Sequence, residues 1–394
     1  MTALVDTPVG LDQETYDLFI DQLQRFVRER LVPAEKTVVA ADAIPPDILT
    51  EMADLGLFGL SIPEKFGGAG MSASQYLNAI VELSWAAPAF RAVTSIGNGM
   101  FNTALRQFGT QAQQQQWLPA IAQGRISSFA ITEPDSGSDS AALRSSAKKE
   151  GDHYVLNGVK RYITNAPIAD VILVIARTSE TPQPKNAHIS AFLVPADTPG
   201  LTIGSADKKM GQSGSQIADV VLSDVRLPRS ALLGETEGTG FQVAMKSLNS
   251  GRLSVAAASL GYSKRALDSG VRYAMGRKAF GESVASFQLI QAKIADSRAE
   301  IYAMETMLAD AASKVDNGID VRLQAACTKM FASEACGRIV DRVVQIYGGA
   351  GYLQEYEAER FFRDSRIYRI FEGTTEIMQL VIAKETLKHY GSIA

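Results

Sequence analysis

The sequence predicts an α+β protein that is mainly α-helical and consists of three consecutive domains. The observation behind this is a change in apolar spacing along the 394 residues, from helical spacing to short β-branched runs and back to helical spacing. Because helices and strands occur in separate blocks, a doubly wound parallel sheet is excluded. We place an N-terminal α-helical domain at residues 1–125, a middle β-domain at 126–235 and a C-terminal α-helical domain at 236–394.

The first block is predicted to be helical from about residue 11. A break rich in glycine and proline at 61–70 divides this block, and the glutamine run within 108–118 suits a polar helix face better than a disordered tract. Apolar residues recur at three- and four-residue steps near its start, as expected for an amphipathic helix: Tyr16, Phe19, Ile20, Leu23 and Phe26.

The middle block is predicted to be all-β and the last block helical. Four β-branched runs separated by turn residues occupy 153–165, 171–178, 189–195 and 218–228. Each run is predicted to be a strand. Helical periodicity then returns, beginning with a long pattern over 240–275.

Composition and charge exclude several classes of protein. The sequence is 46% hydrophobic and 21% charged, which is typical of a soluble globular enzyme with a large core. The net charge of -4 favours neither nucleic acid nor an anionic membrane, so we expect neither as a partner. No apolar run approaches the roughly 18–20 residues of a membrane span, and the N-terminus lacks a secretory pattern. We therefore expect a cytoplasmic protein.

Cysteines and histidines narrow the chemistry further. The two cysteines, Cys327 and Cys336, lie in one helical stretch and are expected to be reduced thiols. His153, His188 and His389 are scattered without the spacing of a metal site or a hydrolase triad, so no metal is predicted. The sequence has no Walker-type phosphate loop and no dinucleotide fingerprint, so a cofactor would have to bind by another route.

Two segments could bind a cofactor. Residues 129–139 combine hydroxyl side chains with turn-forming amides, which suit the polar edges of a planar ligand or a phosphate. A plain surface turn is the alternative. In residues 275–281, Arg277 could bind a pyrophosphate while Phe280 packs on an aromatic ring. The alternative there is a basic helix end that complements the helix dipole.

A third segment carries the candidate base. A Glu-Gly-Thr sequence begins at Glu372, where the glycine lets the backbone approach a ligand closely. Ile370 and Phe371 precede it, and an apolar setting would raise the pKa of Glu372 and suit it to proton abstraction. The alternative is a helix start capped by Thr374 or Thr375, and both interpretations can hold together.

Taken in order, five motifs resemble the acyl-CoA dehydrogenase family over nearly the whole chain. Each motif alone is weak, but five in the family's order are specific, and the helix–β–helix layout agrees. The resemblance implies FAD-dependent α,β-dehydrogenation of an acyl-CoA thioester. The motifs are ITEPDSGSD at 131–139, RYITN at 161–165, GRKAFG at 276–281, QIYGGAGY at 345–352 and RIFEGTTEI at 369–377.

The resemblance assigns the chemistry to Glu372. It matches the family's catalytic base, which removes the α-proton while the β-hydride passes to flavin N5. The thioester carbonyl would be polarised by the Glu372 amide and a ribityl hydroxyl of FAD, which together form an oxyanion hole. In some relatives the base lies one residue before Arg252; Gly251 stands there, so Glu372 has no competitor.

The resemblance also implies the binding residues. Thr374 and Glu376 match the loop beside the flavin, and Ser138 and Arg252 match positions near the CoA pantetheine and the active-site wall, with Ser138 also close to FAD. Residues matching the isoalloxazine lining are Phe129, Ile131, Thr132, Tyr162 and Thr164. FAD contacts matching those from a neighbouring subunit are Arg277, Phe280, Gln288, Gln345 and Gly349. A shared cofactor site implies an obligate oligomer, a homotetramer built as a dimer of dimers.

Two positions depart from the family pattern. Tyr162 stands where many members carry tryptophan, so ring stacking would be smaller there. Asn249 stands where some members carry aspartate, which weakens any CoA contact assigned to it.

The segment 89–100 bears on the substrate. Arg91 and Ser95 lie four residues apart and so on one helix face. The segment resembles glutaryl-CoA dehydrogenases, in which an Arg and a Ser at this spacing hold the substrate's distal carboxylate. Alternatively, Arg91 points to solvent or pairs with Glu82 or another acidic side chain. The carboxylate near that arginine in glutaryl-CoA dehydrogenases is replaced here by Ser84.

These observations predict a dehydrogenase for a short- or medium-chain acyl-CoA, with a polar-tailed or dicarboxylic acyl group as the sharper variant. Electrons would pass to an electron-transfer flavoprotein. An acyl-carrier-protein-thioester dehydrogenase or an acyl-CoA oxidase on the same fold is the alternative. A non-catalytic flavin-binding scaffold is disfavoured because Glu372 is present.

Overall fold

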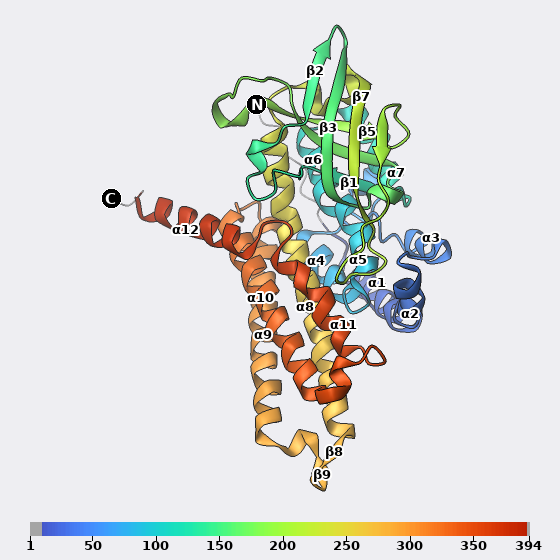
Figure 1. Cartoon of the computed structure of the whole chain (residues 1–394), viewed down its shortest axis with the longest axis vertical. Helices are drawn as coiled ribbons and strands as arrows, with labels where there is room; N and C mark the ends of the chain where they lie inside the picture. Colours follow the sequence, from blue (N-terminus) through green and yellow to red (C-terminus); the bar gives the residue numbers. More distant parts are fainter. Residues whose placement is uncertain (1–9, 392–394) are drawn as a thin grey trace.

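The structure is a computed structural model that describes residues 10–391. Helices precede and follow a mixed β-sheet along the chain, and Figure 1 shows the sheet at one end and a long helical bundle at the other. The predicted, mainly helical α+β class is confirmed.

Side-chain caps begin several of the N-terminal helices. Asp12 accepts a hydrogen bond from the Thr15 amide at 3.0 Å, which fixes the first turn of α1. Ser72 and Gln75 form a capping box that begins α4, and Thr110 caps α7. The helices are α1 (Gln13–Phe26), α2 (Val32–Ala41), α3 (Pro46–Asp54), α4 (Ala73–Leu83), α5 (Pro88–Ser95), α6 (Asn102–Phe108) and α7 (Gln111–Ala122), with π-helical segments at Val27–Leu31 and Ile96–Phe101.

The middle of the chain forms a seven-stranded sheet in the order β1-β4-β2-β3-β7-β6, with β5 paired to β4. β1 runs parallel to β4, whereas β3 pairs antiparallel with β2 and β7. β3, β4, β5 and β7 coincide with the predicted runs; β1, β2 and β6 escape prediction because they are too short to show a pattern. The strands are β1 (Ser127–Ala130), β2 (Ser146–Glu150), β3 (His153–Thr164), β4 (Val171–Arg177), β5 (Ile189–Pro195), β6 (Leu201–Ile203) and β7 (Ile217–Pro228).

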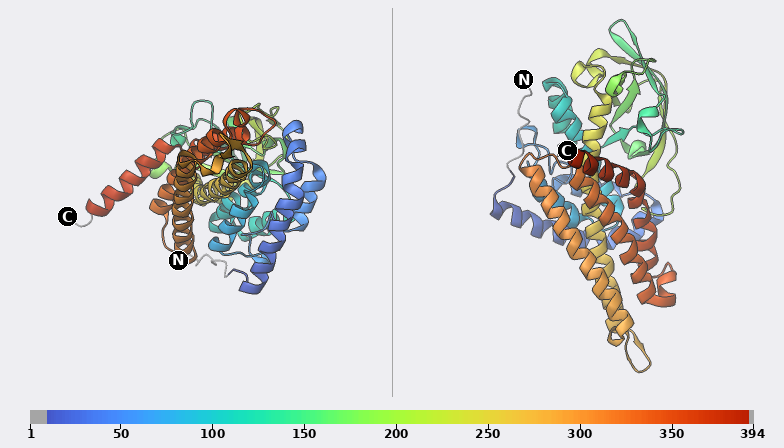
Figure 2. Two further views of the ribbon diagram at one scale, coloured as in Figure 1. Left: turned by 90° about the horizontal axis from the view of Figure 1, so that it is seen from below. Right: turned by 90° about the vertical axis from the view of Figure 1, so that its left-hand side faces the viewer.

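The C-terminal block is a bundle of long helices. α8, α9, α10 and α11 run side by side, and the β8–β9 hairpin closes the end of the bundle farthest from the sheet (Figures 1 and 2). α12 projects away from the body of the molecule (Figure 2). The elements are α8 (Gly240–Gly276), β8 (Lys278–Ala279), β9 (Glu282–Ser283), α9 (Gln288–Asp316), α10 (Arg322–Tyr347), α11 (Ala358–Ser365) and α12 (Thr375–Gly391). Across residues 10–391, no helix is both long and apolar enough to span a bilayer.

Strand β4 is buried on both faces. Val171, Leu173 and Ile175 of β4 pack in a core with α6, α7 and α8. Ile172 and Val174 point the opposite way, into a second core with β3 and β7. Because β4 is buried on both faces, its sequence is an unbroken apolar run. The same packing joins the sheet to the start of α8.

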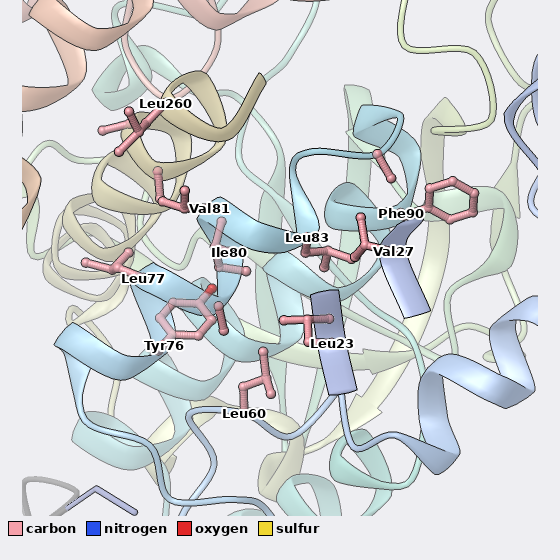
Figure 3. Packing of buried hydrophobic residues seen from close by; sticks show 14 of the residues in the cluster. Leu23, Val27, Leu60, Tyr76, Leu77, Ile80, Val81, Leu83, Phe90 and Leu260 are labelled. Atoms are coloured by element: carbon pink, nitrogen blue, oxygen red, sulfur yellow. The ribbon is translucent and has the colours of Figure 1, made fainter. Parts of the chain in front are cut away.

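The predicted apolar face of α1 packs against other helices. Leu23 is fully buried, and Figure 3 shows it among Val27, Ile80 of α4 and other core side chains, with Leu260 of α8 in the same cluster. The rest of the predicted face is half-buried around this cluster: Tyr16, Phe19, Ile20 and Phe26. The N-terminal helices are therefore packed onto the C-terminal bundle.

A buried ion cluster joins the same two blocks. Glu35 of α2 accepts hydrogen bonds from Arg265 at 2.9 Å and from Arg360 at 2.6 Å, and it is only 3% exposed. Burial opposes the charge of Glu35, but both guanidinium groups outweigh it and hold its pKa below the ordinary value.

We expect Glu35→Gln to lower the free energy of unfolding by about 3 kcal/mol, because the buried Arg265 and the half-buried Arg360 lose their shared anion. Urea unfolding followed by circular dichroism measures this. The exposed Glu29→Gln is the control and should change stability by less than about 0.5 kcal/mol. A loss for Glu35→Gln as small as that of the control would contradict a stabilising role.

Candidate active site

The turn at Glu372 lies between Arg366–Arg369 and α12. Glu372 has a φ of 54°, in the left-handed region, and Gly373 follows with a φ of 98°. A non-glycine residue adopts this conformation only when its surroundings hold it there. The Ile377 amide donates to Thr374 Oγ1 at 3.2 Å, so Thr374 caps α12 and the helix-start interpretation holds together with the catalytic one.

The Glu372 carboxylate is buried and unpaired. Its Oε2 atom is shielded from solvent and has no hydrogen-bond partner among residues 10–391. Burial raises the pKa of Glu372, while the charges of Arg91, Lys329 and Arg252 oppose that rise. A carboxylate whose oxygen accepts no hydrogen bond remains available to take a proton.

The expected apolar setting is only partly present in the residues before Glu372. Ile370 is 47% exposed, whereas Phe371 is half-buried and packs against a core cluster that contains Tyr368. The carboxylate faces α8 at Gly251, where a Cβ atom would lie 1.9 Å from Glu372 Oε2. Only glycine at that position leaves room for the carboxylate.

Arg252 forms the adjacent wall. It is 8% exposed, its Nη1 donates to Asn249 Oδ1 at 2.8 Å, and its Nε lies 3.5 Å from the Glu372 carbonyl oxygen. Asn249 therefore orients Arg252 within this chain. Asn249 thus has a structural role at the wall of the site.

Arg91 and Ser95 lie inside the protein. They are 3% and 7% exposed, and Arg91 Nη1 donates to Ser95 Oγ at 3.2 Å, which confirms their common helix face. Glu82 pairs with Arg28 at 3.9 Å, so the alternatives of an exposed Arg91 or an Arg91–Glu82 pair are wrong. Within the described chain, Arg91 has no carboxylate at salt-bridge distance and its Nε has no hydrogen-bond partner.

Two tyrosines share this interior. Burial raises the pKa of Tyr76 to about 12, and the Arg91 charge opposes that rise. Burial also raises the pKa of Tyr368, again opposed by Arg91. Arg91 therefore interacts electrostatically with both tyrosines and with Glu372. Nothing in the sequence marks either tyrosine as part of the site, because in an amphipathic pattern both resemble ordinary core residues.

A second group of predicted residues gathers where β1 meets the end of β3. The Arg161 amide donates to the Thr132 carbonyl at 2.8 Å, which brings the segment after β1 beside Tyr162 and Thr164. A register shift between Lys160 and Ile163 marks a bulge in β3.

This bulge exposes an aromatic ring. Tyr162 has a φ of 60° and is 58% exposed, whereas Phe129 and Ile131 are 8% exposed. A strained, open tyrosine beside the hydroxyls of Thr132 and Thr164 fits a planar cofactor with polar edges, such as a flavin. Ser138 is exposed farther along the same loop.

The loop is anchored by a buried ion pair that the sequence analysis missed. Lys160 Nζ lies 2.7 Å from Glu133 Oε1, and both residues are buried. Glu133 also accepts hydrogen bonds from the amides of Arg144 at 2.6 Å and Ser145 at 2.9 Å. Glu133 stands in the motif at 131–139 and Lys160 directly precedes the motif at 161–165, but nothing in the sequence pairs the two.

Comparison with known proteins decides the family. Models of the acyl-CoA dehydrogenase N-terminal, middle and C-terminal domains match residues 13–125, 128–225 and 238–387. The chain belongs to the acyl-CoA dehydrogenase family. The predicted cofactor, FAD, and the predicted class, an oxidoreductase acting on acyl-CoA, are thereby confirmed.

Individual relatives of this acyl-CoA dehydrogenase are similar over nearly their whole length. The human mitochondrial short-chain specific acyl-CoA dehydrogenase is 39% identical, covering 96% of this chain and 92% of that protein. Butyryl-CoA dehydrogenase from Megasphaera elsdenii is 34% identical with a TM-score of 0.91, covering 96% of this chain and 99% of that one. Glutaryl-CoA dehydrogenase from Mycobacterium smegmatis is 31% identical with a TM-score of 0.89, covering 97% and 96%.

The remaining predicted FAD contacts lie elsewhere in this acyl-CoA dehydrogenase. They cluster at the end of the bundle farthest from the sheet, around the β8–β9 hairpin and the last turn of α10 (Figures 1 and 2). Within a single chain these residues do not lie near Tyr162, as expected if they contact the FAD of a neighbouring subunit. Phe280 at the hairpin tip is 97% exposed. The residues are Arg277, Phe280, Gln288, Gln345 and Gly349; Glu376, by contrast, is exposed in the first turn of α12 beside the base.

Proposed function

We propose that this acyl-CoA dehydrogenase desaturates a short acyl-CoA whose acyl chain ends in a carboxylate, with Glu372 as the base and Arg91 as the anchor for that carboxylate. The observation that carries the proposal is a buried Arg91 that lacks a carboxylate partner within residues 10–391 and shares an interior with Glu372. The two side chains would act on opposite ends of one acyl group.

The base chemistry follows from the position of Glu372. Its free Oε2 takes the α-proton, so the Cα–H bond breaks and negative charge develops toward the thioester carbonyl. The Glu372 amide, held in its left-handed turn, would donate to that carbonyl oxygen. FAD, when bound, supplies the acceptor for the β-hydride. Tyr162, Thr132 and Thr164 would hold its ring.

The role of Arg91 as the anchor for the far end of the acyl group follows from electrostatics. An unpaired guanidinium is costly to bury, and a substrate carboxylate would satisfy it through charge-assisted hydrogen bonds from Arg91 and Ser95. Among the neighbouring charges, that of Arg91 most strongly opposes the rise in the pKa of Glu372 caused by burial. This electrostatic coupling of the anchor to the base supports a short acyl chain. The similarity to a glutaryl-CoA dehydrogenase agrees with it.

We expect Arg91→Met to lower kcat/KM for glutaryl-CoA by about 10²-fold, because a buried charge pair with the substrate is lost. Losing the Arg91 charge also raises the pKa of Glu372, so both substrates are compared at alkaline pH, where the base is ionised in either protein. There the value for butyryl-CoA should change by less than about 3-fold, since that substrate has no charge to pair. Steady-state assays with an artificial electron acceptor measure both. The exposed Arg25→Met is the control. Equal losses for the two substrates would contradict an anchoring role.

The partners are proposed on the same basis. We expect a cytoplasmic homotetramer, a dimer of dimers, in which the exposed hairpin at Phe280 reaches the cofactor of a second subunit. Electrons would leave to an electron-transfer flavoprotein. Light scattering on the holoenzyme measures the oligomer, and a monomer that retains full FAD would contradict the shared site.

A further inference from the structure

Lys329 of α10 is a buried cation that the proposed chemistry does not use. It is 0% exposed, and its Nζ donates to the Gly373 carbonyl at 2.6 Å, one residue after the base. In the described part of the chain the other fully buried lysine is Lys160, which has the carboxylate of Glu133 at 2.7 Å. Lys329 has no carboxylate at such a distance among residues 10–391.

The charged groups around Lys329 come from three helices and the Glu372 turn. Burial lowers the pKa of Lys329 to about 8, and Glu372 is the anion that opposes this most. Arg252 of α8 lowers the pKa further, while Glu334 of α10 and Glu376 of α12 raise it more weakly.

The weaker carboxylates are engaged or exposed. Glu334 accepts a hydrogen bond from Thr375 at 2.6 Å and lies 3.5 Å from Arg369, and Glu376 is exposed. The principal counter-charge for Lys329 is therefore the catalytic carboxylate of Glu372.

We propose that Lys329 is a positioning residue for the catalytic base: its ammonium group holds the Gly373 carbonyl, and thereby the left-handed turn at Glu372, and its charge keeps the buried carboxylate ionised. This inference rests on the proposed role of Glu372 as the base. It assigns to α10 a function that neither the motifs nor the flavin contacts require.

The geometry explains why the lysine contacts a carbonyl instead of the base itself. A direct ion pair would occupy Glu372 Oε2 and lower the pKa of Glu372 strongly, so the carboxylate would become a poorer proton acceptor. By donating to Gly373, Lys329 supplies a fixed positive charge while Oε2 keeps no partner within the described residues. The base then remains both charged and free.

The pH dependence tests this role. Arg91 of α5 and Arg252 of α8 also oppose the effect of burial on the pKa of Glu372, Arg91 most strongly, and both remain in a Lys329 variant. Removing Lys329 raises that pKa further, so the base is protonated up to a higher pH. In Lys329→Met, we expect the acidic limb of flavin reduction by saturated acyl-CoA to move upward by about one pH unit or more. The rate should therefore fall most at acid pH and recover toward alkaline pH. The effect should appear mainly in kcat, because Lys329 acts through the turn that carries the base.

Two variants serve as controls. Lys329→Arg retains the charge and should keep the acidic limb near its wild-type position. Lys36→Met removes an exposed lysine from α2 and should leave the whole profile unchanged. A loss in Lys329→Met that is uniform with pH would overturn the proposal, since a purely structural lysine acts in that way. Wild-type protein that no acyl-CoA reduces would instead refute the proposed function itself.

A stability cycle keeps the proposal testable if Lys329→Met unfolds. Thermal melting of wild type, Lys329→Met, Glu372→Gln and the double variant measures the coupling between the two charges. We expect Lys329→Met to be less destabilising in the Glu372→Gln background, or to fold only there. Strictly additive effects would overturn the proposed coupling.

Discussion

Replacing Glu372 with glutamine is expected to slow the reduction of bound flavin by a saturated acyl-CoA by about 10²-fold or more. Glutamine preserves the shape of the side chain but cannot accept the α-proton. Oε2 of Glu372 has no hydrogen-bond partner among residues 10–391, so the substitution breaks no hydrogen bond of this atom. We therefore expect FAD binding to be unchanged. Anaerobic stopped-flow absorbance measures the rate, and the flavin content of the purified variant should match that of wild type.

The exposed Glu14→Gln on α1 serves as the matched control and should reduce at the wild-type rate. Undiminished reduction in Glu372→Gln would mean that another group removes the proton. Gly251, which faces the Glu372 carboxylate from α8, has no side chain that could replace the base. Such a result would therefore contradict the mechanism as a whole.

Replacing Gly251 with alanine is expected to lower kcat by about 10²-fold, because displacing a catalytic group by about 1 Å can cost that much. The added Cβ would lie 1.9 Å from Glu372 Oε2 and 2.7 Å from Cδ, so the carboxylate must move. Helix propensity favours alanine over glycine by about 1 kcal/mol within a helix. Activity should therefore fall without a comparable loss of thermal stability.

The control lies in the same helix. Gly270→Ala adds a Cβ that approaches only the side chains of Val343 and Ile346, the nearest atom at 3.2 Å, and should retain activity. Wild-type activity in Gly251→Ala would show that the base does not work from its position against α8. Loss of folding in Gly251→Ala but not in Gly270→Ala would also contradict the expected separation of activity from stability.

The sequence predicts the fold where local pattern and burial agree. Leu23 recurs at helical spacing with its neighbours and is fully buried, and β4 is apolar throughout because it enters two cores. β2 and β6 have five and three residues, so too few positions exist for a period to appear. Their pairing with longer strands, and not their own pattern, makes them strands.

The site is predicted less completely, because its contacts are not local. Glu372 stands in a distinctive Glu-Gly-Thr motif, but its setting depends on Gly251 from α8 and on Lys329, whose partner Gly373 is 44 residues away. One signal for Lys329 does exist. It falls on the helical face marked by Ala325 and Ala332, and a lysine among buried small residues indicates a buried charge.

Anaerobic titration of the purified protein with saturated acyl-CoAs tests the central claim most directly. Butyryl-, octanoyl-, isovaleryl- and glutaryl-CoA are added in turn while the visible absorbance of oxidised flavin is recorded. We predict a yellow protein whose flavin is bleached by short thioesters, with glutaryl-CoA preferred if Arg91 anchors a carboxylate. A yellow protein that none of these thioesters bleaches would contradict acyl-CoA as the substrate and favour a carrier-bound thioester. A colourless protein that cannot be reconstituted with FAD would contradict the account entirely.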